Sequence, residues 1–259
     1  MSYNVIENGR VLTIQDGTMP QYYIVATEAD KPPNPSIGDI CKVTATTKEY
    51  SCFVSNLWSL TNSPCKEVYH NHTGYANDDI ANAYTSGLGA STAVAPHMHH
   101  LGSGDGVGDY GAWVFEIYAN PTTEYFTFNA KLGPITNGNE GNRCTAIGIS
   151  NVYIGGYVTS RPGCLFMHIM DDTWVISTYD GVSGQIYEQI TSLVDGDNIT
   201  IMGQKDRVLY FVNGVLVGNH TQYLPSMTLF PVAVCSVESA SGSVQRLQNI
   251  DYMGIEVMK

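Results

Sequence analysis

The segment KDRVLYFVNGVLVGNHTQYLP, residues 205–225, constrains the fold most, because it joins a turn signal to strands that are apolar on both faces. Asn213-Gly214 tolerates the positive φ angles of a two-residue type I′ turn. Folding about this turn pairs apolar residues across it: Val212 with Val215, Phe211 with Leu216, and Tyr210 with Val217. A hairpin with one wet face would alternate apolar and polar residues. We therefore expect both strands inside a stack of two sheets or under a covering neighbour, away from a free edge.

From Gly111 to the C-terminus, strand-like segments such as AWVFEIYA, NITIMGQ and LFPVAVCSVE recur between Gly, Asn, Asp and Pro turns. No helical pattern interrupts them. Only a sheet packed on another sheet buries so many two-faced strands. An internal repeat, the mark of a propeller or solenoid, is not evident. The sequence therefore predicts an all-β chain with an antiparallel β-sandwich over residues 111–259.

The first 110 residues divide into three zones by composition. Residues 1–20 carry short apolar alternations without a core of their own, which is typical of a docking arm. Residues 21–61 place strand-like runs around a Pro-rich turn and predict a small β module. Residues 62–110 are rich in Gly and His, as expected of a linker or a long functional loop. Within them, an Asn cap followed by two Asp residues predicts a short helix over residues 77–84.

The charge balance argues against a nucleic-acid partner. Lys plus Arg number 12 against 24 for Asp plus Glu, a formal net charge of −12, and such a field repels phosphate backbones. No run approaches the roughly 18 apolar residues that a membrane helix needs, and the first residues are too polar for a signal peptide. We expect a soluble chain without membrane insertion or an export signal.

Six cysteines, at positions 41, 52, 65, 144, 164 and 235, show no C-x-x-C spacing, which argues against zinc-ribbon and thioredoxin-type motifs. One interpretation is that they are free buried thiols. The other concerns ICKVTATTKEYSCFV: a hairpin turning at Thr46-Thr47 would set Cys41 opposite Cys52, where a cross-strand disulfide fits geometrically. The sequence leaves both interpretations open.

The order of elements in DGDNITIMGQKDRVLYFVNGVLVG, followed by LFPVAV and closed by IDYMGIEV, resembles the C-terminal half of concanavalin-like and laminin-G-like jelly rolls. In those domains a strand ending in "vNG" and a following strand lead to a final strand near the terminus. The resemblance covers residues 111–259 and implies that the predicted sandwich is a concanavalin-like jelly roll.

The segment VATEADKPPNPSIGDICKVTATTKEYSCFVSNLWSLT is similar to a short module that tail fibres and decoration proteins of bacterial viruses carry. Together the two resemblances imply a virion structural protein: a head fibre, decoration, turret or tail component with an outward-projecting, lectin-like domain for host attachment. Such a protein would assemble in the host cytoplasm, contact capsid or tail proteins through its N-terminal region, and form a trimer or pentamer. The alternative is a free-standing carbohydrate-binding or carbohydrate-active protein.

Catalytic patterns are not found in the sequence. Concanavalin-like glucanases carry E-x-D-x-x-E or E-x-D-x-E on one strand, and no such run occurs here. Glu116 stands alone, and Asp251 and Glu256 are an odd number of residues apart, which sends them to opposite faces of an ideal strand. G-x-S-x-G, H-E-x-x-H and P-loop motifs are also missing. We therefore expect a protein that is not an enzyme.

Two H-x-H motifs are candidate metal ligands: His70 with His72, and His97 with His99. Residues two apart in an extended chain project to one side, so each motif offers two imidazoles to one ion. Repeated around a three-fold axis, this arrangement resembles the metal-stapled needles of some viral tails. The alternative is that these are exposed loop histidines beside Gly and Asn.

Carbohydrate binding, with or without calcium, is the other candidate site. Jelly-roll lectins hold sugars with Asp and Asn side chains and an aromatic platform in loops at the sandwich edge. The loops here offer Asp171, Asp172, Tyr179, Asp180, Asp195, Asp197 and Asn198. Asp, Asn and Gly also populate β-turns for conformational reasons alone, so plain turns explain the same residues.

Overall fold

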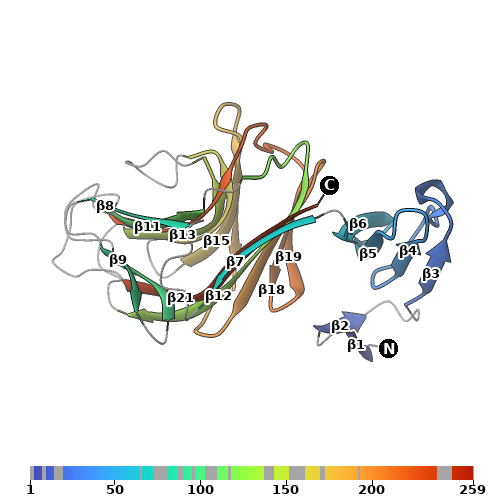
Figure 1. Cartoon of the computed structure of the whole chain (residues 1–259), viewed down its shortest axis with the longest axis horizontal. Coiled ribbons are helices and arrows are strands. Elements are labelled where there is room, and N and C mark those ends of the chain that lie inside the picture. The colour runs from blue at the N-terminus through green and yellow to red at the C-terminus, as the bar shows by residue number, and fades with distance from the viewer. Residues whose placement is uncertain are drawn as a thin grey trace. The chain divides into compact units, whose positions relative to one another are not determined.

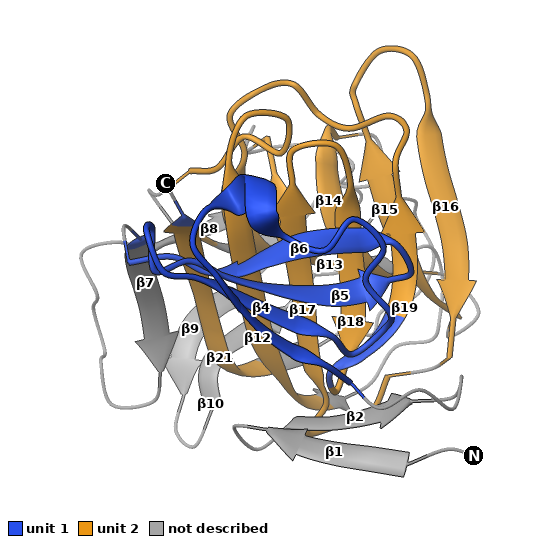
Figure 2. Ribbon diagram, turned by 90° about the vertical axis from the view of Figure 1, so that its right-hand side faces the viewer, with its two compact units in different colours: residues 1–67, 214–216, 258–259 blue, residues 68–213, 217–257 orange. Residues whose placement is uncertain are grey.

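The computed structural model describes residues 3–7, 10–14, 20–64, 66–72, 81–86, 90–94, 97–102, 110–115, 118–136, 143–151, 161–169, 173–191, 193–237 and 247–258. Over these ranges the chain is all β except for one 3-10 turn, Glu28–Asp30. No helix in the described part has the length and hydropathy of a membrane span. The chain divides into two compact units, one of residues 1–67 with 214–216 and 258–259, the other of residues 68–213 with 217–257 (Figure 2).

Two antiparallel sheets build the larger unit (Figure 1). The eight-stranded sheet runs in the order β19 (Val215–His220), β18 (Val208–Val212), β17 (Asn198–Gln204), β12 (Tyr125–Thr136), β21 (Leu247–Met258), β10 (His97–Gly102) and β9 (Ala90–Val94), with β7 (Lys66–His72) also paired to β21. The seven-stranded sheet runs in the order β16 (Gln185–Ile190), β15 (Thr173–Tyr179), β14 (Gly163–Ile169), β13 (Arg143–Ser150), β20 (Phe230–Val237), β11 (Tyr110–Phe115) and β8 (Ala81–Ser86). The predicted sandwich is confirmed.

The main core lies between the two sheets and draws on both. Its largest members are fully buried rings: Phe126, Phe128 and Tyr210 from the eight-stranded sheet, and Phe166 and Trp174 from the seven-stranded sheet. Burying one such side chain contributes about 1.5–3 kcal/mol relative to leaving it in water. Sheet-on-sheet packing therefore explains why no helix is needed to cover these strands.

A second apolar cluster lies on the other face of the seven-stranded sheet. Its members alternate along the strands with those of the main core, since side chains of successive residues point to opposite faces. They are Val114, Ala146, Leu165, Met167, Val175 and Val232. The central strands of this sheet are thus apolar on both faces, which accounts for their nearly continuous apolar sequences.

The hairpin that constrained the fold forms as predicted at its turn. Asn213 and Gly214 have φ angles of 50° and 79°, the signature of a type I′ turn. Strand β18 is buried, but β19 stands at the end of the sheet order, and Val215 is 61% exposed. The expectation that both strands lie away from an edge is therefore wrong for β19. The apolar residues of β19 are buried on only one side of the strand, so no further strand is needed beyond β19 to cover them.

The region expected to be a linker contributes strands β7, β8, β9 and β10 to the two large sheets. Residues 81–84, the second half of the expected helix, belong to β8, which pairs with β11 from Ala81 to Ser86. The first half lies outside the described residues. An N-cap signal contributes only about 1 kcal/mol. A continuous ladder of backbone hydrogen bonds to a distant strand outweighs it.

The smaller unit contains a four-stranded sheet in the order β3 (Tyr22–Val25), β4 (Ile40–Val43), β5 (Glu49–Val54) and β6 (Leu57–Asn62), and a separate hairpin of β1 (Tyr3–Glu7) and β2 (Arg10–Ile14). Strand β3 runs parallel to β4, and the other pairs are antiparallel. Buried Asp39 fixes the crossover, because its carboxylate accepts hydrogen bonds from the backbone amides of Gln21 (2.8 Å) and Ser36 (2.9 Å).

The register of this sheet decides the disulfide question. Tyr50 lies opposite Cys41, while the amide of Cys52 donates to the carbonyl oxygen of Asp39 at 2.9 Å. Cys41 and Cys52 are both free and buried, as are Cys164 and Cys235. The disulfide hypothesis is wrong because the β4–β5 pairing is shifted from the one that a turn centred on Thr46-Thr47 would give.

Candidate functional site

Strand β16 forms an edge of the seven-stranded sheet and presents two amides and a phenol on one face. These side chains, Gln185, Tyr187 and Gln189, alternate along the strand and are all exposed, Tyr187 to 44%. Val175 lies opposite Gln189 and belongs to the second apolar cluster, so this face points away from the main core. We call the three residues the β16 strip.

The neighbouring strand orients part of the β16 strip. Ser177 of β15 lies opposite Tyr187, and its hydroxyl oxygen accepts a hydrogen bond from Gln185 Nε2 at 2.7 Å. The strip therefore combines an exposed aromatic ring with amide groups, of which Gln185 is held in place. Rings of this kind stack on apolar surfaces of ligands, and amides both donate to and accept from hydroxyl groups. The arrangement suits an uncharged, polyhydroxylated ligand.

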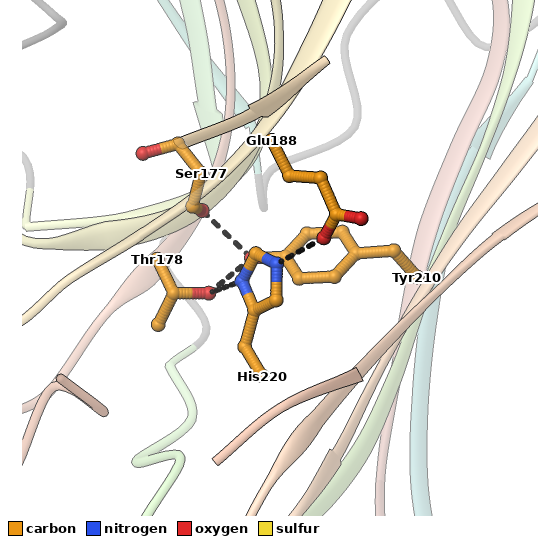
Figure 3. A network of polar contacts seen from close by, with 5 residues as sticks. All are labelled: Ser177, Thr178, Glu188, Tyr210 and His220. Atoms are coloured by element: carbon orange, nitrogen blue, oxygen red, sulfur yellow. Dashed lines mark hydrogen bonds and ion pairs between the residues drawn. The ribbon is translucent and has the colours of Figure 1, made fainter. Parts of the chain in front are cut away.

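The other face of β16 joins a buried polar network that links the edge strands of both sheets (Figure 3). Glu188 Oε2 lies 3.3 Å from His220 Nε2 on β19. His220 Nδ1 lies 2.7 Å from Thr178 Oγ1, which lies 2.6 Å from the Tyr210 hydroxyl. Tyr210 donates to the carbonyl oxygen of Ser177 at 2.7 Å.

Burial controls the charge of this network. It lowers the pKa of His220, while the Glu188 carboxylate acts in the opposite direction. It raises the pKa of Tyr210 well above its usual value and that of the Cys164 thiol to about 12. Hydroxyl, imidazole and carboxylate follow one another in the order of a hydrolytic triad, but Thr178 is fully buried and cannot meet a substrate. The network is a structural link between the sheets.

Asp180, a predicted sugar ligand, holds the turn between β15 and β16. Its Oδ1 accepts hydrogen bonds from the amides of Val182 and Ser183, both at 2.8 Å, and of Gly184 at 3.2 Å. These bonds, the one from Val182 first, lower the pKa of the Asp180 carboxyl. Tyr179 is half-buried at the end of β15. Asp171 and Asp172 lie outside the described residues.

The remaining predicted sugar ligands shape a different turn, before β17. Asp197 Oδ2 accepts from the amide of Val194 at 2.8 Å, and its Oδ1 accepts from Asn213 Nδ2 at 2.7 Å. The Asn198 amide donates to Asn213 Oδ1 at 2.9 Å, and Asp195 is exposed in the same turn.

The two turns lie at opposite ends of β16, a strand of six residues that spans about 20 Å. Asp180 and Asp197 therefore do not converge on one site. Asp180 accepts hydrogen bonds from backbone amides, and Asp197 accepts them from one backbone amide and from the Asn213 side chain.

The H-x-H motifs lie in strands, not loops. His70 and His72 are in β7, His97 and His99 are in β10, and both strands pair with β21. Their side chains lie outside the described part of the structure, so metal binding there stays a prediction. Among the side chains that the structure does describe, no group of three His, Cys, Asp or Glu could hold a metal ion.

Glu188 is the one carboxylate in the described strands of the seven-stranded sheet. Retaining glycoside hydrolysis uses two carboxylates about 5 Å apart. These strands do not supply such a pair. Glu116 lies outside the described residues, and Asp251, on β21 in the other sheet, pairs with Lys131 at 3.5 Å.

Sequence reasoning missed the β16 strip, although its signal is present. In QIYEQI the polar or aromatic residues Gln185, Tyr187 and Gln189 alternate with Ile186, Glu188 and Ile190, which marks two distinct faces. The buried network has no comparable local signal, because Thr178 and His220 are 42 residues apart.

No family model matches the chain, and no curated protein matches it. Solved structures do. The carbohydrate recognition domain of Emp47p matches with a TM-score of 0.52 at 8% identity, over 77% of this chain and 100% of that one. A β-glucanase of Bacillus licheniformis matches with a TM-score of 0.52 at 10% identity, over 74% and 98%. A prokaryotic β-1,3-1,4-glucanase (lichenase) from a mouse hindgut metagenome gives 0.52 at 9%, over 74% and 99%.

At these identities the likeness shows the fold alone. The larger unit has a concanavalin-like jelly-roll fold, which confirms the fold implied by the resemblance drawn from residues 111–259. A carbohydrate recognition domain and glucanases share this fold, so the likeness does not separate binding from catalysis.

Proposed function

We propose that this protein binds carbohydrate through the β16 strip of its jelly roll. The observation that carries the proposal is Tyr187, exposed to 44% between the exposed amides of Gln185 and Gln189 on the outer face of an edge strand. A sugar ring stacks on the phenol while its hydroxyl groups exchange hydrogen bonds with the amides. The Emp47p domain of the same fold is a carbohydrate recognition domain, which adds support.

The ligand class follows from charge. The strip carries no charged side chain, and the chain has a formal net charge of −12, which repels acidic sugars. Neutral glycans are therefore favoured over sialylated or sulfated ones. Asp180 and Asp197 hold turns and take no part in the proposed binding. We propose that the protein binds its glycan without hydrolysing it.

The test is a glycan array of neutral and acidic oligosaccharides, with and without calcium, followed by titration of the best ligand. Tyr187→Ala should weaken binding about tenfold or more, which corresponds to about 1.4 kcal/mol. Tyr187→Phe should retain most of the affinity, and Tyr22→Ala, an exposed tyrosine of the other compact unit, should leave it unchanged. No glycan bound by the folded protein, or equal affinity of Tyr187→Ala, would refute the proposal.

The setting that we propose for this activity is the surface of a virus particle. Support comes from the small module: its sequence is similar to virion modules, and it folds as its own sheet, β3–β6. On β3, at the end of that sheet, Tyr22 and Ile24 are 55% and 66% exposed. Exposed apolar side chains on an edge strand suit docking to a capsid or tail protein. The chain would assemble in the host cytoplasm as a trimer or pentamer, with a metal ion at the H-x-H motifs.

Three measurements separate this setting from a free-standing carbohydrate-binding or carbohydrate-active protein. Light scattering at micromolar concentration should give a homo-oligomer, whereas a monomer contradicts the virion proposal. Elemental analysis of untagged protein should find a transition metal, and its absence removes the histidine site. Incubation with β-glucans should release no reducing ends, and release would indicate an enzyme instead.

A further inference from the structure

The polar network behind the β16 strip contains a line of four contacts, and the Cys164 thiol also contacts Tyr210 and Thr178 beside this line. The four contacts run from the Ser177 carbonyl oxygen to the Tyr210 hydroxyl (2.7 Å), to Thr178 Oγ1 (2.6 Å), to His220 Nδ1 (2.7 Å), and from His220 Nε2 to Glu188 Oε2 (3.3 Å). Each contact joins two electronegative atoms and needs one proton between them to be a hydrogen bond. The two ends, a carbonyl and a carboxylate, only accept.

With a neutral His220, the line has one proton too few for its four contacts. Tyr210 and Thr178 supply one proton each, and a neutral imidazole supplies one more, so three protons serve four contacts. An imidazolium supplies two. All four contacts are then filled in one direction: Nε2 donates to Glu188, Nδ1 to Thr178, Thr178 to Tyr210, and Tyr210 to the Ser177 carbonyl.

When His220 is neutral, one of the four contacts has no proton, and the contact distances and the burial of the residues show which contact this is. The three contacts of 2.6–2.7 Å are buried and too short for two lone pairs to face each other. The contact to Glu188 is the longest, and that side chain is 53% exposed, so it can turn to water. Neutral His220 therefore keeps its proton on Nδ1, and its bare Nε2 faces Glu188.

We propose that His220 and Glu188 form a proton-operated latch between β19 and β16, the edge strands of the two sheets. Uptake of one proton at Nε2 closes the latch, and loss of that proton releases Glu188 to solvent. The titratable groups that face the network are Glu188, Tyr210 and Cys164. Tyr210 and Cys164 stay uncharged at physiological pH because burial raises the pKa of both.

The direction of the pH effect follows from burial. The folded pKa of His220 is lowered, so the unfolded chain, with an ordinary pKa of about 6.5, takes up the proton first as the pH falls. Stability contributed by neutral His220 is present above about pH 6.5 and is lost as the pH falls through the folded pKa. Glu188 limits this loss by accepting the new Nε2–H. The latch thus offsets part of this loss at the edge strands in acid, independently of any glycan.

Nuclear magnetic resonance of imidazole nitrogens in the whole chain tests the latch. Above pH 8, His220 should be protonated at Nδ1 alone, and acidification should add the proton at Nε2. Glu188→Gln should lower the pKa of His220 by about half a unit or more, because it removes the charge that favours the imidazolium. Glu49→Gln, which changes a carboxylate of the other compact unit, should leave that pKa unchanged.

A second variant tests the proton count itself. Thr178→Val removes the acceptor of the Nδ1 proton, so the neutral imidazole should shift its proton to Nε2, toward Glu188. A neutral wild-type His220 protonated at Nε2, or an unchanged pKa in Glu188→Gln, would overturn the proposal. Glu188 is half-exposed, so its variant stays informative even where Thr178→Val does not fold.

Discussion

The ring of Phe126 lies over Gly203, its partner on the adjacent strand: a Cβ on Gly203 would sit 2.0 Å from Phe126 Cε1. Strand β17 therefore needs a residue without a side chain where β12 carries its first buried ring. Gly203→Ala should destabilise the fold by about 1–3 kcal/mol, as overpacking does. Urea unfolding measures this, and Phe126→Leu in the same chain should recover part of the loss. Full additivity of the two changes would contradict the contact.

Asn213 tests the turn that constrains the fold. It has a φ of 50°, and its side chain bonds to the Asn198 amide and to Asp197. Asn213→Ala loses both the tolerance of positive φ and the two hydrogen bonds, and should cost about 2 kcal/mol in chemical unfolding. Asn213→Gly keeps the backbone freedom and should cost less. Equal losses would mean that backbone strain plays no part.

Asp180 predicts a pH dependence. Its pKa is lowered in the folded state, so its contribution to stability is present above the unfolded pKa of about 3.9 and is lost as the pH falls through the lower folded pKa. Asp180→Asn should lower the melting temperature at pH 7, and the difference from wild type should shrink by pH 2.5. Asp195→Asn, at an exposed position, is the control. A constant difference over this range would contradict the role of the charge.

The burial of the cysteines predicts which thiols are protected from alkylation in the native protein. Cys41, Cys52 and Cys164 are free and buried, and the pKa of Cys164 is raised to about 12. Iodoacetamide at pH 8 should leave all three unmodified in the native protein, because buried thiols are not accessible as thiolates. In denaturant without a reductant all three should be alkylated, as read by peptide mass spectrometry. A Cys41–Cys52 cross-linked peptide would contradict the register of β4 and β5.

The jelly roll could be predicted from local sequence patterns. Asn213-Gly214 specified its own turn, and the two-faced apolar strands required two packed sheets. Strands β7–β10 escaped prediction because their partners are remote: His99, for example, pairs with Ile250. A Gly- and His-rich sequence holds no sign of that partner.

The roles of the site residues could not be predicted from the sequence either. Asp180 and Asp197 have the chemistry of sugar ligands, but backbone amides, and for Asp197 also the Asn213 side chain, already donate to them, which residue type does not reveal. His220 and Glu188 come from different sheets, so only the packed sandwich brings them together.

Strand β21 lies in the interior of the eight-stranded sheet, between β12 and β10, and supplies Ile250, Met253, Ile255 and Val257 to the core. Among the described strands it is also the last in chain order, so a ribosome makes it after its neighbours. Until residues 247–258 emerge from the exit tunnel, β12 and β10 lack their shared neighbour, and hydrophobic surface stays uncovered. The sandwich therefore cannot close before residues 247–258 are made, and a chain cut short before residue 247 should aggregate or be degraded.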